Sequence, residues 1–154
     1  MKRDIDQIIE TLPYLVKPGY CDHSRSIATH EASHAMIIIL NGYTPERVSI
    51  DPPITIFGWD GLHADFTASL HMAGAVGQAV QSGSYVFSDQ DRINLYDVIK
   101  RAGLEYPDIE MIWKKTHVEL INHWQWVQLI ASNLLREGTL YDEYFKRLLH
   151  EAEN

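Results

Sequence analysis

The segment that most constrains this chain is residues 29–42, which read T-H-E-A-S-H-A-M-I-I-I-L-N-G. Apart from two histidines and a glutamate, it consists mainly of small and large apolar residues and is suited to burial. Ser24 and Ser26 are candidate N-caps upstream, and Asn41-Gly42 is a natural C-terminal stop. The sequence therefore predicts a helix from Ser24 to Leu40 that carries three ionisable side chains into the core.

His30 and His34 stand four residues apart, so a helix presents both imidazoles on one face, with their Cβ atoms about 5–6 Å apart. At that spacing two ring nitrogens can bind one zinc ion at about 2.0–2.1 Å. Glu31 lies about 100° around the helix, where its carboxylate can take a proton from water activated by the metal. This H-E-x-x-H arrangement is typical of zinc peptidases, in which the glutamate is the general base. The alternative is a pair of structural histidines, but burying these groups without a metal carries a desolvation cost.

Composition and charge limit the other classes of function. The chain has 154 residues, a formal net charge of −8 and 45% hydrophobic residues. These values fit one globular domain over residues 1–154, with 1–22 as an N-terminal extension. No cluster of Lys and Arg is dense enough to bind a nucleic-acid backbone. The single cysteine, Cys21, excludes an internal disulfide, and no apolar run is long enough for a signal peptide or a membrane span. We therefore expect a cytoplasmic protein without a membrane span.

The remaining pattern is mostly helical. Alternating apolar and polar residues predict a strand from Glu46 to Asp51, and Ile54–Phe57 is a candidate for a second short strand. The other predicted helices are Asp4–Leu12, Asp65–Gln81, Ser88–Ala102, Pro107–Glu137 and Tyr141–Glu151. The expected fold class is mainly α: a helical zinc-peptidase domain with a small β-hairpin next to the H-E-x-x-H helix.

A catalytic zinc site has three protein ligands and one open position, so a third ligand must come from another element. The candidates are His23, His63, His71, Asp89, Asp91, His117 and His123. Spacing in the sequence does not choose among them. The two aspartates also have an ordinary explanation, because Ser88-Asp89-Gln90-Asp91 resembles a capping box, in which an acidic side chain holds the start of a helix.

Several motifs, taken in order, resemble the peptidase domain of FtsH-type ATP-dependent zinc metalloproteases. A-T-H-E-A-S-H-A is followed by P-E-R-V-S-I-D, where that family has H-E-A-G-H-A and a short V-x-x-V-T-I strand. H-M-A-G-A-V-G-Q-A-V resembles the family's small-residue helix, and S-D-Q-D-R-I-N-L-Y-D-V-I lies where the family provides an aspartate ligand. V-Q-L-I-A-S-N-L-L-R-E-G-T-L resembles the closing helix. The resemblance spans roughly residues 24 to 145.

Carried over position by position, the resemblance makes His30, His34 and Asp91 the zinc ligands and Glu31 the catalytic base. Asp89 or a histidine stays open as an alternative third ligand. Ser33 replaces the family's glycine between the histidines, and the family's paired glutamates are missing around Gly77-Gln78. The family's ATPase module and membrane anchor have no counterpart in the sequence, so a separate unfoldase is a candidate partner.

The expected function is that of a zinc-dependent metalloendopeptidase that cleaves unfolded or flexible polypeptides, with Zn²⁺ as cofactor. We expect the substrate to pair with the Glu46–Ile50 strand as an added strand, in contact with Val48, Ser49 and Ile50. One alternative is a catalytically silent regulatory or binding domain of the same fold, and another is a zinc hydrolase acting on a small amide. A homo-oligomer is compatible with each of these functions. The other distinctive side chains, Trp113, Trp124, Trp126 and Tyr106, are expected to pack in the core or at an interface.

Overall fold

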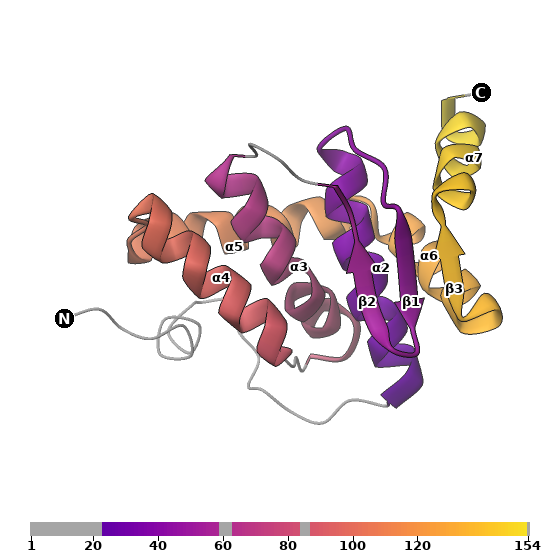
Figure 1. The fold of residues 1–154 in the computed structure, drawn as a ribbon, viewed down its shortest axis with the longest axis horizontal. Helices are drawn as coiled ribbons and strands as arrows, with labels where there is room; N and C mark the ends of the chain where they lie inside the picture. The colour runs from indigo at the N-terminus through magenta and orange to yellow at the C-terminus, as the bar shows by residue number, and fades with distance from the viewer. Residues whose placement is uncertain (1–22, 59–62, 84–86, 154) are drawn as a thin grey trace.

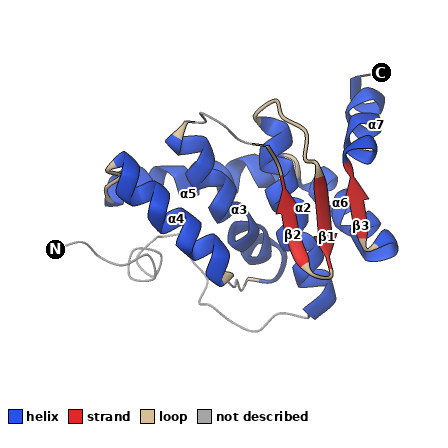
Figure 2. Ribbon diagram, viewed as in Figure 1, coloured by secondary structure: helices blue, strands red, loops and turns tan. Residues whose placement is uncertain are grey.

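The computed structural model describes residues 23–58, 63–83 and 87–153 (Figure 1). Within these ranges the chain is mainly helical, with a small antiparallel sheet, as the sequence predicted (Figure 2). The elements are α2 (His23–Leu40), β1 (Arg47–Ile50), β2 (Pro53–Ile56), α3 (Ala64–Ser82), α4 (Asp89–Ala102), α5 (Tyr106–Asn122), α6 (Trp124–Glu137), β3 (Thr139–Tyr141) and α7 (Asp142–Glu153). Cys21 and the predicted helix Asp4–Leu12 lie outside the described residues. No described helix is both long and apolar enough to cross a membrane.

Helix α2 lies at the centre of the fold, because almost every side of it is covered by another element. It contacts α3, α6 and the β1–β2 hairpin, and each residue from 28 to 38 is buried. A helix that is apolar on all sides is stable only when it is surrounded in this way. The predicted buried helix is therefore confirmed, and the ionisable side chains that it carries lie inside the protein.

The sheet lies against α2 and consists of three strands in the order β2-β1-β3 (Figure 2). β1 pairs with β2 through a tight hairpin, with Ser49 opposite Ile54. On its other side β1 pairs with β3, with Val48 opposite Leu140. The hairpin was predicted, but β3 was not. Its three residues are too few to show the period-two alternation by which a strand is recognised.

The predicted helix Pro107–Glu137 is wrong in one respect, because the structure has two helices there. α5 ends and α6 begins at His123, whose backbone leaves the helical region at φ −118° and ψ 27°. The break lets each half contact a different partner, since α5 packs on α3 and α6 packs on α2. No Gly or Pro marks the position, so the sequence carries no recognisable signal for it.

Candidate metal centre

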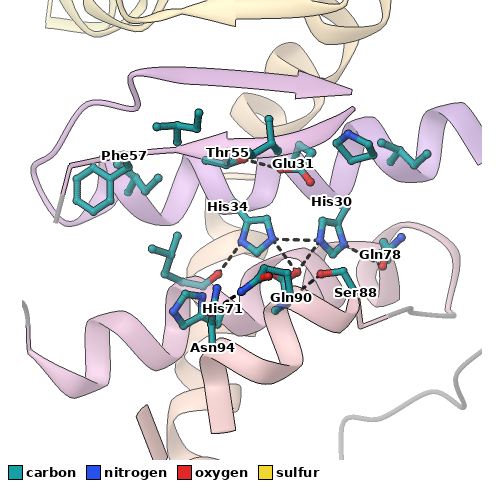
Figure 3. A pocket seen from close by; sticks show the side chains of 17 residues that line it. His30, Glu31, His34, Thr55, Phe57, His71, Gln78, Ser88, Gln90 and Asn94 are labelled. Carbon is teal, nitrogen blue, oxygen red and sulfur yellow. Dashed lines mark hydrogen bonds and ion pairs between the residues drawn. The ribbon is translucent and has the colours of Figure 1, made fainter. Parts of the chain in front are cut away.

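Three side-chain atoms from two helices converge at one point. Nε2 of His30 lies 3.0 Å from Nε2 of His34, and Oδ2 of Asp91 lies 2.9 Å from the first nitrogen and 3.1 Å from the second. Figure 3 shows both imidazoles side by side, between the hairpin and α4. Three atoms bound tetrahedrally to zinc at about 2.0–2.1 Å would be separated by about 3.3 Å. The observed triangle is within a few tenths of an ångström of that size.

The hydrogen-bond partner of Nδ1, the ring nitrogen that faces away from Asp91, fixes the tautomer of each histidine. Nδ1 of His34 lies 2.6 Å from the backbone oxygen of Leu70. A carbonyl can only accept, so Nδ1 carries the proton. Nδ1 of His30 lies 3.2 Å from Oε1 of Gln78, which is also an acceptor. In the neutral form of each ring, Nε2 therefore presents a lone pair toward the other histidine and toward the carboxylate of Asp91.

Charge and burial oppose each other at this cluster. Burial lowers the pKa of His34, but the charge and hydrogen bond of Asp91, with the charge of Glu31, outweigh it and raise that pKa to about 9. Burial raises the pKa of Asp91, but His34 and His30 together hold it well below its usual range. Three acceptor atoms in mutual contact repel one another unless a cation lies among them. The cluster therefore requires a proton or a metal ion.

Helices α2 and α3 bring the two histidines into place through a regular antiparallel pairing. Ser26 lies opposite Gln78, His30 opposite Gly74 and His34 opposite Leu70, each pair one helical turn from the next. Gly74 leaves room for the imidazole of His30, since a Cβ there would lie 2.3 Å from the ring. The small-residue helix noticed in the sequence therefore functions as the support for both histidines.

Asp91 comes from the first turn of α4. The hydroxyl of Ser88 accepts a hydrogen bond from the backbone N–H of Asp91 at 3.0 Å and caps the helix. The carboxylate of Asp91 faces the histidines, with 14% of its side chain exposed. Asp89 points elsewhere: its side chain is 91% exposed and pairs with Arg92. The structure thus brings Asp91, and not Asp89, to the two histidines.

The histidine candidates for a third ligand differ in position. His63 is exposed just before α3, and Nδ1 of His123 donates to the backbone oxygen of Glu119 at the end of α5. His117 is half-buried on α5. His71 is buried and lines the same cavity as His30 and His34, and its pKa is lowered to about 4 by burial and by the charge of His34. The side chain of His23 lies outside the described residues.

Glu31 lies beside the triangle on the hairpin side. It is buried, with 5% of its surface exposed. Its carboxylate, together with His30 and His34, forms a group whose ligand atoms lie within 4.8 Å of one another and could hold a metal ion. Thr55 on β2 donates its hydroxyl to Oε2 of Glu31 at 2.6 Å (Figure 3). No sequence pattern marks Thr55, because its contact with Glu31 depends on how the hairpin folds over α2.

The cluster lines an open cavity of about 380 Å³. One wall is β2 with Phe57, another is α4 around Asp91 and Asn94, and the histidines form the floor (Figure 3). This cavity leaves room for a ligand beside the two histidines and Glu31.

The expected pairing of a substrate with the Glu46–Ile50 strand is wrong. β1 is the central strand of the described sheet, and β2 and β3 occupy both of its edges. Val48 and Ser49 are buried, and the N–H of Ile50 donates to Gly138 on the β3 side. A second chain has no access to the backbone of β1. The edge beside the two histidines is β2, which lines the same cavity.

The aromatic side chains behave as the sequence predicted. Trp113 is fully buried, and the other three pack partly buried against the core; these are Trp124, Trp126 and Tyr106. None of them lines the cavity beside the histidines.

Neither a scan against protein-family models nor a search of curated proteins finds a match to this chain.

Proposed function

We propose that the chain is a zinc-dependent endopeptidase. The observation that carries this proposal is the triangle of His30, His34 and Asp91, in which three lone-pair atoms lie within 3.1 Å of one another. Two imidazoles and a carboxylate form a ligand set suited to zinc, and three protein ligands are the usual number for a catalytic site. The residues present therefore fit the ion.

Zinc bound by these residues would polarise a substrate carbonyl and lower the pKa of a water molecule in the cavity. Glu31 is the general base. As the water oxygen bonds to the carbonyl carbon, the carboxylate of Glu31 takes the proton that the water loses. It then gives this proton to the amine nitrogen as the carbon–nitrogen bond breaks. Thr55 holds one carboxylate oxygen of Glu31 at 2.6 Å, which restricts the direction in which the base points.

The edge of β2 is suited to bind an extended polypeptide next to Glu31. The N–H of Ile50 donates to the backbone oxygen of Gly138, on the β3 side of β1. The backbone groups of successive residues in a strand point to opposite sides, so those of Ser49 point toward its partner Ile54 on β2. The backbone groups of Thr55 then point to the free edge of β2. A substrate strand added there would be recognised through its backbone, which requires an unfolded or flexible chain and imposes little sequence preference.

The order of motifs that resembles the FtsH-type peptidase domain supports the same chemistry. That resemblance also makes a separate unfoldase a reasonable partner, because the substrate must reach the site in an extended form. The alternative function is a regulatory or binding domain that keeps the metal site and does not cut.

The deciding experiment compares the wild type with Glu31→Gln. Elemental analysis measures bound zinc, and a casein-type assay measures cleavage of an unstructured polypeptide. We expect stoichiometric zinc in both proteins and cleavage only in the wild type, because the amide cannot take a proton. Zinc in both proteins without cleavage in either, with or without an added unfoldase, would favour the binding domain.

A further inference from the structure

We propose that Gln78 is a positioning residue, which sets the tautomer of His30 and thereby the affinity of the site for zinc. This inference rests on the proposed metal site but not on peptidase activity. Gln78 lies on α3, more than two helical turns after Leu70, and its side chain is 5% exposed.

The amide of Gln78 lies between two partners. Its Nε2 donates to Oγ of Ser26 at 2.8 Å, and its Oε1 lies 3.2 Å from Nδ1 of His30. An amide has one accepting end and one donating end. With the NH₂ group directed at Ser26, the oxygen faces His30 and accepts the proton on Nδ1. The lone pair on Nε2 is then available to the metal.

The opposite orientation of the amide would disable the site. If the NH₂ group of Gln78 faced His30, Nδ1 would have to accept, and the proton of the neutral ring would move to Nε2. That proton would occupy the position of the metal. Ser26 accepts from Nε2 in the observed orientation and thereby stabilises it, although it does not contact the ring. Gly74 completes the arrangement, because it lets α3 approach closely enough for Gln78 to reach His30.

His34 provides a comparison within the same site. Its Nδ1 donates to the backbone oxygen of Leu70, which cannot change orientation. Only His30 depends on a side chain whose two ends can exchange. Partners of this kind orient the ring and increase its basicity, and their removal typically weakens metal binding about 10–100-fold.

The experiment measures zinc affinity by competition with a chelator. Gln78→Met keeps the approximate volume but offers only a weak thioether acceptor, and we expect it to bind zinc about 10–100-fold more weakly than the wild type. Gln78→Glu restores an acceptor, and we expect it to bind at least as tightly as the wild type. Ser26→Ala leaves Gln78 in place but frees its orientation, and we expect affinity about threefold or more below the wild type. Gln81→Met, on the same helix but outside the cavity, is the matched control.

Each outcome decides the inference. Wild-type affinity in Gln78→Met would overturn it, and so would a Gln78→Glu variant as weak as Gln78→Met, because position 78 would then only fill space. Should Gln78→Met fail to fold, Ser26→Ala decides: unchanged affinity overturns the inference. A wild type that binds no zinc would remove the site itself. Normal zinc binding without cleavage would overturn the peptidase function alone, so the two failures can be told apart.

Discussion

Gly74 lies directly against the imidazole of His30, so that a Cβ at position 74 would lie 2.3 Å from both Cε1 and Nε2 of the ring. The ring has little freedom to move away, since Gln78 contacts its Nδ1 and Asp91 its Nε2. The absence of a side chain at position 74 therefore leaves the space that His30 occupies in the candidate metal site. It also explains why the histidine can be buried in a helix pair that packs so closely.

Gly74→Ala should reduce zinc affinity by at least about tenfold, because the new methyl group must displace the ring that carries a ligand atom. Alanine favours the helix by up to about 1 kcal/mol, whereas overpacking costs about 1–3 kcal/mol, so the metal-free protein should be slightly less stable. Chelator competition and urea unfolding measure the two effects.

Gly77→Ala is the matched control. Its Cβ would lie 1.8 Å from Oγ of Ser33, which is not a ligand atom. We expect a comparable loss of stability and a smaller loss of zinc affinity. Equal losses of affinity in both variants would mean that helix spacing, and not the ring contact, controls the site.

The sequence predicted the parts of the site that depend on local periodicity. His30 and His34 share a helical face because they are four residues apart, and that relationship holds in any α-helix. The third ligand could not be predicted from local periodicity. Asp91 was preferred over Asp89 only through a resemblance, since both fit a helix N-terminus, and the choice depends on how α4 is oriented against α2. Tertiary packing of this kind is not encoded in spacing.

Asp91→Asn should weaken zinc binding by about 100-fold or more, because it removes a charged ligand atom that lies 2.9 Å from His30 and 3.1 Å from His34. Asp89→Asn should leave the affinity within about twofold, since its side chain is 91% exposed and pairs with Arg92. Both residues occupy the first turn of α4, so the comparison separates ligation from the general effect of an acidic residue at a helix start. Similar affinities in the two variants would contradict the assignment of Asp91.

Zinc binding at pH 7 should release about one proton from the protein. In the metal-free protein, Asp91 helps to raise the pKa of His34 to about 9, so the ring is protonated at neutral pH and the metal must displace that proton. Zinc affinity should therefore rise by up to about tenfold per pH unit as the pH increases toward 9, and the release should disappear above that value. Calorimetry in two buffers of different ionisation enthalpy counts the protons. Zinc binding at pH 7 without proton release would show that His34 is neutral in the metal-free protein.

The same distinction between local and tertiary information applies to the sheet. The β1–β2 hairpin was predicted because alternation and turn residues lie close together in the sequence. The position of β1 between two neighbours was not, because β3 follows about ninety residues later and has only three residues, Thr139–Tyr141. This one pairing moves the accessible edge from β1 to β2 and changes which residues contact a substrate.

Thr55→Val should lower kcat about tenfold with little change in zinc affinity. The valine has the same shape but cannot donate to Oε2 of Glu31, which Thr55 contacts at 2.6 Å, so the base would adopt other orientations and take the proton less efficiently. Thr55→Ser retains the hydroxyl and should keep most of the activity. Because the backbone of β2 is unchanged in both variants, KM for an unstructured polypeptide should change little. A rise in KM with unchanged kcat would instead mean that Thr55 contributes to substrate binding and does not orient the base.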